Sequence, residues 1–428
     1  MVYKIVIIGL GISGLSISNK LTNYYDNKEM CILEASNRVG GRIYTQTIKI
    51  KKKEINNYEL GAGRFCKAHY RLCRLINNLN LEDKIITNKK KINYIIKNKK
   101  IKNIGTVFDI YSNAIKEYNE YNHEKINLTK YTFDTLGKHL VNKGFLSLEK
   151  YNWSRFSFPY DSEFNNMNAE VLFFNLKGQS KYPQFFSLKD GLSQISKGLY
   201  NILIKKGYSC LLNNRLIEFQ KMENGQILLK IDDNGIIKSI KTEKLVLAIP
   251  PNKVLDCKNN ILPKYLTNSI GSFSLYRIYA IFPMSKKTGK VWFNNINRTI
   301  TDNPLRYIIP IDKKKGLIMI SYVTGHLADY VTLHFSNNKK LVNYIMLNLK
   351  KLYPNIAIPK PIWIGGKYWP IGVHYYYPGF NPVDCMNYYL KPTTNPVWLI
   401  GEAYSEYQGW IEGSLQTSEL CLKQIIDY

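Results

Sequence analysis

A glycine-rich turn near the start of the chain, G-L-G-I-S-G over residues 9–14, constrains the fold more than any other feature. Residues 2–8 before it are rich in Ile and Val and predict a short buried strand. Residues 12–24 predict a helix, and residues 29–33 a second buried strand that ends at Glu34. A strand, a helix and a strand in this order imply a parallel sheet, so we expect an α/β fold.

The spacing of the glycines indicates a nucleotide site. Gly9, Gly11 and Gly14 would permit a tight turn, the approach of the backbone to a pyrophosphate, and close packing of helix on strand. The N-terminus of the following helix offers free N–H groups and the positive end of its dipole to phosphates. Glu34, about 20 residues after the last glycine, is placed to accept hydrogen bonds from a ribose.

The same segment permits two other interpretations. Lys4 followed by an apolar run is how a signal peptide can begin, and a glycine-flanked core turn needs no nucleotide. The three glycines together with Glu34 favour the nucleotide site. We therefore expect the N-terminus to be retained and the protein not to be secreted.

Residues 34–42 read E-A-S-N-R-V-G-G-R, in which Gly40 and Gly41 mark a turn. Arg38 and Arg42 carry forked donors that can reach the phosphates of a cofactor. This stretch resembles the fingerprint of the flavin amine oxidases, and the resemblance continues through most of the chain. It implies FAD rather than NAD as the cofactor. Composition and strands such as YRIYAIFPM also resemble divergent members of this family in large DNA viruses.

The resemblance implies a Rossmann-like FAD-binding domain interleaved with an α+β substrate domain built on a mixed sheet. The order of the motifs assigns residues 1–70, 184–270 and 385–428 to the FAD-binding domain. Residues 71–183 and 271–384 then form the substrate-binding domain.

Several further segments resemble parts of the family's cofactor site. Residues 59–65 (ELGAGRF) resemble the loop beside the flavin, residues 212–219 the strand whose backbone contacts adenine, and residues 398–415 the segment at the ribityl chain and flavin ring. The positions that match the family's cofactor-binding residues in these segments are Gly61, Ala62, Leu216, Gly401, Glu402 and Ile411.

The resemblance also implies a substrate site. Arg64 matches the arginine with which L-amino-acid oxidases bind the substrate carboxylate. Trp410 and Tyr375 match the two walls of an aromatic cage that could sandwich a neutral amine, and Trp369 and His374 lie in the same stretch as Tyr375. Because the chain has 33 tyrosines, the tyrosines at 375–377 could instead fill the core. His374 could likewise be a hydrogen-bonded core residue.

The sequence departs from the family at two positions. Residues 370–373 read PIGV where monoamine oxidases carry the cysteine that tethers FAD, so we expect non-covalent FAD. Arg277 occupies the position of the lysine that most members place at the flavin. Arginine stays protonated and cannot act as a base, but it could position water or bind a carboxylate.

The implied function is oxidation of a C–N bond of an amine or L-amino acid to an imine, with O2 reduced to H2O2. If Arg64 paired with an internal acid, a carboxyl-free amine would be the better substrate. Arg277 and the net charge of +28 motivate an alternative, a flavin-binding protein with weak or no catalysis that serves a structural or polyanion-binding role, for example on DNA in a virion. Compositional drift also accounts for such a charge.

The seven cysteines are scattered without a C-x-x-C, and the histidines lack metal-ligand spacing, so we expect neither disulfides nor a metal. No apolar run reaches the ~18 residues that a membrane span needs. These features predict a cytoplasmic protein, in the host cytoplasm or the virion if it is viral.

Overall fold

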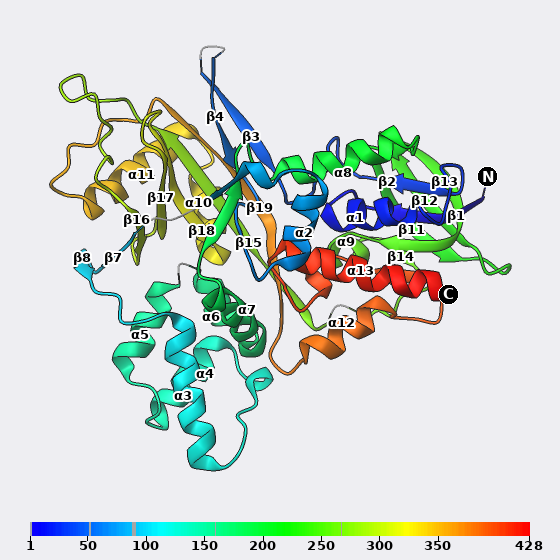
Figure 1. Ribbon diagram of the computed structural model, residues 1–428, viewed down its shortest axis with the longest axis horizontal. Helices are drawn as coiled ribbons and strands as arrows, with labels where there is room; N and C mark the ends of the chain where they lie inside the picture. The colour runs from blue at the N-terminus through cyan, green and yellow to red at the C-terminus, as the bar shows by residue number, and fades with distance from the viewer. Residues whose placement is uncertain (1, 51–52, 88–90, 159, 267) are drawn as a thin grey trace.

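The computed structural model describes residues 2–50, 53–87, 91–158, 160–266 and 268–428. It is a mixed α/β structure in which two large sheets lie side by side (Figure 1). A group of helices, drawn in cyan and green, lies below the second sheet in this view.

The first sheet contains the first and the last of the described strands. Its strands, in spatial order, are β10 (Cys210–Leu211), β2 (Met30–Leu33), β1 (Val2–Ile8), β13 (Ile236–Leu247), β12 (Ile227–Asp233), β11 (Asn214–Lys221) and β14 (Lys258–Asn259), with β20 (Val397–Leu399) also paired to β13. β1 is parallel to β2 and to β13, whereas β12 is antiparallel to both of its neighbours. The parallel β1–α1–β2 unit predicted from the sequence is confirmed. Helix α1 (Ile12–Leu21) is shorter than expected, because Thr22 and Asn23, which are poor helix formers, begin a turn.

The side chains of β1 alternate between two cores, as a strand's geometry requires. Ile5 and Ile7 pack in a cluster with α1, α8 (Ser193–Lys205) and α13 (Ile411–Asp427). Val6 and Ile8 belong to the core on the other face, which extends to Tyr389 in α12 (Pro382–Leu390). A strand buried on both faces reads as a continuous apolar run, which is why residues 5–8 carry no polar alternation.

The second sheet is mostly antiparallel. Its order is β19 (Trp363–Tyr376), β15 (Ile270–Ile281), β18 (Leu317–Thr324), β17 (Tyr307–Asp312), β16 (Arg298–Thr301), β7 (Ile92–Ile96) and β8 (Lys99–Ile101). Ile278 and Ala280 of β15 pack in one cluster with Ile345 of α11 (Asn338–Leu352). Helix α10 (Gly325–His334) follows β18 directly.

The remaining elements connect or cover these sheets. The helices are α2 (Tyr70–Asn78), α3 (Val107–Asn122), α4 (Phe133–Asn142), α5 (Leu148–Ser157), α6 (Asp161–Asn166), α7 (Ala169–Lys181) and α9 (Pro251–Leu255). The strands are β3 (Thr45–Ile50) and β4 (Lys53–Glu59), which form a ribbon, and β5 (Phe65–Cys66), β9 (Phe185–Leu188) and β6 (Ile85–Thr87), which form a small sheet.

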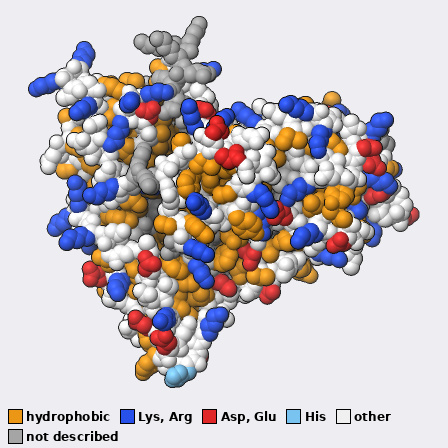
Figure 2. Space-filling model, in the orientation of Figure 1, with side chains coloured by type: hydrophobic (Ala, Val, Ile, Leu, Met, Phe, Trp, Pro, Cys, Tyr) orange, Lys and Arg blue, Asp and Glu red, His pale blue; other side chains and the backbone are white. Residues whose placement is uncertain are grey.

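Lys and Arg side chains are spread over the face drawn in Figure 2, between apolar and acidic side chains, and do not gather over one element there. Within the described part of the chain, no helix combines the length and the apolar character that a membrane crossing requires.

Candidate functional site

The glycine turn leaves open space at one of its three glycines. Gly9 has φ +102°, and an added Cβ would lie 2.5 Å from the Ala248 oxygen. At Gly14 an added Cβ would lie 1.8 Å from the Gly9 oxygen, so β1 and α1 are in close contact there. Gly11, in contrast, has no heavy atom within 4 Å of its Cβ position, and it caps α1 without a side-chain hydrogen bond. Space beside an uncapped helix N-terminus fits the predicted pyrophosphate.

Glu34 and the turn at residues 38–42 adjoin this space. Glu34 Oε2 accepts a hydrogen bond of 2.8 Å from the Leu10 N–H, which places the carboxylate beside the glycine turn. Gly41 is close as well, because its Cβ position is 3.2 Å from the Gly11 Cα. Arg38 donates to the Gly41 oxygen at 2.6 Å and lies over the Tyr44 ring at 4.2 Å. The structure therefore brings these predicted cofactor residues together.

A buried cluster joins Arg42, Glu402 and His374. Arg42 donates to Glu402 Oε1 and, at 3.1 Å, to the Gly372 oxygen, and Glu402 Oε1 is 2.8 Å from His374 Nδ1. Burial raises the pKa of the Glu402 carboxyl, but Arg42 and His374 outweigh burial and bring that pKa to about 2. Burial lowers the pKa of His374, and Glu402 offsets this only in part. The cluster thus holds an ionised Glu402 beside a guanidinium, and His374 has a structural partner.

The other predicted cofactor residues have more varied surroundings. The Ala62 N–H donates to the Arg42 oxygen at 3.0 Å, and an added Cβ at Gly61 would lie 1.8 Å from the same oxygen. At Gly401 an added Cβ would make only ordinary van der Waals contact, with its nearest neighbours at 3.8 Å. Ile411 is buried at the first turn of α13. Leu216 is buried in β11, where the Cys257 thiol donates to its oxygen.

Trp369, predicted to bind substrate, packs against the loop at residues 59–65. Its indole N–H donates to the Leu60 oxygen at 2.6 Å, and the Arg38 guanidinium carbon lies 5.9 Å from its ring. The structure therefore places Trp369 beside the predicted cofactor residues, and its role stays a prediction.

Arg64 lies against two aromatic rings. Its guanidinium carbon is 4.3 Å from the Phe185 ring centre and 5.9 Å from that of Trp410. Phe185 and Trp410 are nearly parallel, with 9° between their planes and 6.2 Å between their centres. His69 packs on Trp410 at 4.5 Å, and burial, aided by the charge of Arg64, lowers the pKa of His69 to about 4. Phe185 was not assigned from the sequence.

Tyr375, the predicted second wall of the cage, contacts other rings. It packs on Phe273 at 5.7 Å and on Tyr377 at 5.4 Å, and it is 6% exposed. Among the ring pairs that join described residues, none links Tyr375 to Trp410. Its role in a cage stays a prediction.

Arg277 lies beside the loop that carries Arg64. Its Nη1 donates weakly to the Glu59 oxygen at 3.4 Å, and an added Cβ at Gly63 would lie 2.8 Å from Nη1. Its guanidinium carbon is 4.6 Å from the Tyr322 ring centre. Its Nε is buried, with no hydrogen-bond partner in the described part of the chain. Neither Arg277 nor Arg64 forms an ion pair with any residue that the structure describes.

Helix α6 adds two groups that sequence reasoning missed. Tyr160, directly before α6, packs on Tyr322 at 4.8 Å. The Glu163 carboxyl has a buried Oε2 without a hydrogen-bond partner among the described residues. Burial raises the pKa of Glu163 well above its usual range, and the charge of Arg64 offsets only part of that rise. The sequence held no signal for either residue, because no motif surrounds them and tyrosine is abundant.

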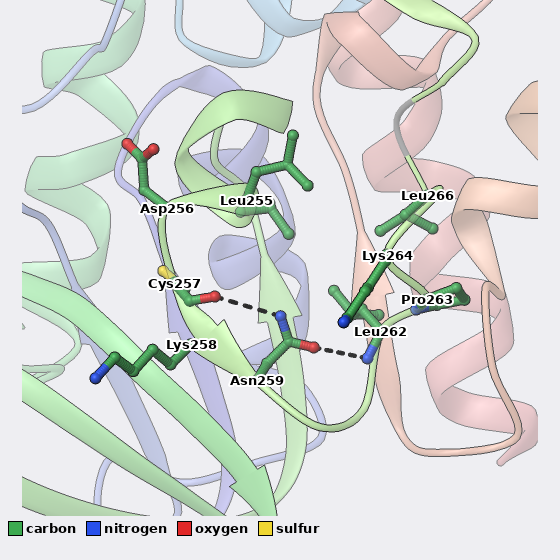
Figure 3. A pocket seen from close by; sticks show the side chains of 10 residues that line it. Leu255, Asp256, Cys257, Lys258, Asn259, Leu262, Pro263, Lys264 and Leu266 are labelled. Atoms are coloured by element: carbon green, nitrogen blue, oxygen red, sulfur yellow. Dashed lines mark hydrogen bonds between the residues drawn. The ribbon is translucent and has the colours of Figure 1, made fainter.

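A hollow of about 420 Å³ lies elsewhere, between α9 and the chain at residues 262–266 (Figure 3). The Asn259 side chain spans it, donating to the Cys257 oxygen at 3.4 Å and accepting from the Leu262 N–H at 2.8 Å. None of its lining residues is one that the sequence predicts to bind cofactor or substrate. Because no buried charged group converges on it, we do not place chemistry there.

Comparisons with known proteins bear on the family to which the chain belongs. The family model of flavin-containing amine oxidoreductases matches residues 12–425. A stretch of 94 residues is 35% identical to amine oxidase (flavin-containing) A of Equus caballus, covering 22% of this chain and 17% of that protein. The corticosteroid-binding protein of Candida albicans is 32% identical over 91 residues, which is 21% of this chain and 18% of that protein. Coproporphyrinogen III oxidase of Staphylococcus aureus is 33% identical over 101 residues, which is 24% of this chain and 21% of that protein. Each match therefore spans about a fifth of the relative or less.

Proposed function

The chain belongs to the family of flavin-containing amine oxidoreductases, and from this we propose that it is a FAD-dependent amine oxidase. It would oxidise the C–N bond of an amine or L-amino acid to an imine, while O2 is reduced to H2O2. The family implies a flavin cofactor and an amine substrate. The choice of substrate rests on the surroundings of Arg64.

We propose a Rossmann-like domain, formed by residues 1–70, 184–270 and 385–428, as the part that holds FAD. Gly9, Gly11 and Gly14 would hold the pyrophosphate at the N-terminus of α1, and Glu34 the ribose. The open space at Gly11 supports this fit. Binding would be non-covalent, because residues 370–373 offer no cysteine.

The single observation that carries the substrate assignment is the unpaired guanidinium of Arg64. It is half-buried against Phe185 and Trp410, and no carboxylate of the described residues pairs with it. An arginine removed from water without a counter-charge is costly, so a site of this kind favours an anion from outside. A carboxylate bound by the guanidinium fork would identify the substrate as an amino acid.

The protein's own groups would position this substrate and set its protonation. The aromatic faces of Phe185 and Trp410 exclude water, and burial lowers the pKa of the substrate amine, which favours the neutral form. Arg277 cannot take a proton, so we assign it to binding rather than to base catalysis. The chemistry that a bound flavin supplies is the passage of two electrons and two protons from the substrate to O2. Water then hydrolyses the imine to a carbonyl and ammonia.

The test is anaerobic reduction of the purified yellow protein by L-amino acids and by carboxyl-free amines, followed at the flavin absorbance. We expect L-amino acids to bleach the flavin, and Arg64→Gln to abolish that reduction selectively. A flavin that no amine reduces would overturn the oxidase and favour the binding-protein alternative. Equal loss for carboxyl-free amines would contradict the carboxylate role. Arg74→Gln, which removes an exposed arginine paired with Glu419, is the matched control.

A further inference from the structure

Arg64 and Arg277 lie close together, and neither forms an ion pair with a residue that the structure describes. Arg277 Nη1 packs against Gly63, the residue before Arg64. Tyr160, directly before α6, packs on the Tyr322 ring over which the Arg277 guanidinium lies, and it acts on the pKa of both arginines. Two positive charges in partly enclosed surroundings repel each other and need counter-charge.

None of the nearby acids forms an ion pair with either guanidinium. The Glu59 carboxylate accepts from the Thr45 hydroxyl at 2.8 Å and from the Leu192 N–H at 2.6 Å; burial raises its pKa, and the charge of Arg277 is among the effects that offset this rise. Burial also raises the pKa of Glu163 well above its usual range, and the charge of Arg64 offsets only part of that rise.

Asp161, at the start of α6, is already paired with another cation. Its Oδ1 lies 2.6 Å from Nη2 of Arg306, which is itself buried. Among the described residues, therefore, neither guanidinium has an ion-pair partner, although both lie in partly enclosed surroundings.

An amino acid with a neutral side chain brings one carboxylate and would leave the second guanidinium unpaired. We propose that Arg64 and Arg277 bind the two carboxylates of an acidic L-amino acid, of the aspartate or glutamate class, one carboxylate to each guanidinium. The inference rests on the proposed oxidase function and narrows its substrate. Tyr322 and Tyr160 contribute hydroxyls to the surroundings of the two arginines.

The guanidinium geometry supports a planar partner. Arg277 stacks over Tyr322, and its Nε is buried with no partner among the described residues. A carboxylate can accept from Nε and an Nη atom together, which a lysine at this position could not offer. The replacement of the family's lysine by Arg277 would thus exchange the point charge of an ammonium group for a planar guanidinium that can donate two parallel hydrogen bonds to one carboxylate.

The decisive experiment compares acids with their neutral isosteres on the flavin-loaded wild-type protein. Binding of glutarate and succinate, which cannot be oxidised, is measured against glutaramate and succinamate by the change in the flavin spectrum. We expect the dicarboxylates to bind roughly 30-fold tighter or more, the factor that corresponds to losing one partner of an enclosed charge pair. L-Glutamate and L-aspartate should likewise reduce the flavin faster under anaerobic conditions than L-glutamine and L-asparagine do.

Variants then assign the second carboxylate. Arg277→Met should reduce the preference for dicarboxylates to less than about threefold, whereas Arg277→Lys should retain part of it. Arg74→Gln removes one positive charge from an exposed arginine paired with Glu419 and should leave the preference intact. If Arg277→Met does not fold, the isostere comparison on the wild-type protein still decides.

The outcomes separate the two proposals. Dicarboxylate preference without flavin reduction by any amine would support the site and overturn the oxidase. Equal binding of acids and amides, with reduction by neutral amino acids or by tyramine, would overturn the acidic substrate and leave the oxidase standing. The latter result would assign Arg277 to the cofactor instead.

Discussion

The glycine turn allows a paired test of which glycines serve packing and which serve the cofactor. An added Cβ at Gly14 meets the Gly9 oxygen at 1.8 Å, so Gly14→Ala forces β1 and α1 apart. We expect the free energy of unfolding to fall by about 3 kcal/mol, the upper end for overpacking, because backbone has to move. At Gly11 the space is open and φ is −67°, which alanine adopts without strain.

Gly11→Ala should therefore fold normally but bind FAD poorly. The gain of about 0.4–1 kcal/mol from a less flexible unfolded chain offsets the poorer helix cap. The methyl group would occupy the place of the pyrophosphate, at a cost of about 1–3 kcal/mol, which is about 5- to 150-fold in Kd. The assay is titration of flavin-depleted protein with FAD, with thermal unfolding of the same flavin-free sample. Wild-type FAD affinity in Gly11→Ala would refute the placement of the pyrophosphate.

Three other substitutions, with a fourth as a control, test the electrostatics of the fold. The pKa of Glu402 falls from 4.5 to about 2 on folding, so this carboxylate contributes about 3 kcal/mol to the free energy of unfolding above pH 4.5, and the contribution is lost as the pH falls toward 2. Acid denaturation of Glu402→Gln should therefore show a weaker dependence of the free energy of unfolding on pH in this range. The pKa of His69 falls from 6.5 to about 4 on folding, so this histidine contributes about 3 kcal/mol to stability above pH 6.5, and that contribution is lost as the pH falls toward 4. In His69→Gln the free energy of unfolding should therefore change less steeply with pH between 6.5 and 4. The buried Glu412 carboxylate accepts from the Arg71 and Leu72 N–H groups, so Glu412→Ala should cost about 2–4 kcal/mol in urea unfolding. Glu243→Ala, which breaks only an exposed ion pair, should cost less than about 1 kcal/mol, and equal effects of the two would contradict this reasoning.

The parts of the site that sequence could predict are those where the backbone itself demands a residue type. Gly9 is needed for its positive φ and Gly14 for its contact with β1. Glu34 follows because it ends the strand next to β1, and parallel strands end at one edge of a sheet. Such local constraints leave a pattern that can be read without knowing distant contacts.

The substrate end depends on contacts between distant segments, which leave no such pattern. Phe185 reaches Trp410 across more than half of the chain, and Glu163, in α6, is affected by the charge of Arg64, which lies in the loop before β5. Tyr375 shows a further reason. The pairing of β15 with β19 shifts register between Phe273 and Leu275, and a bulge of this kind changes which side chains share a face. The direction in which Tyr375 points therefore could not be derived from strand alternation.

If the proposed function holds, the exchange of lysine for Arg277 would change the electrostatics of the site rather than remove its activity. A lysine in enclosed surroundings loses its charge readily, because burial lowers its pKa, whereas a guanidinium stays charged at every pH at which the protein folds. With Arg64 it would keep a constant positive field at the place where the amine of the proposed substrate has to become neutral. Positive charge lowers the pKa of that amine in the same direction as burial does. The two arginines would thus bind the carboxylates and promote the reactive form of the amine through one arrangement, without a base at position 277.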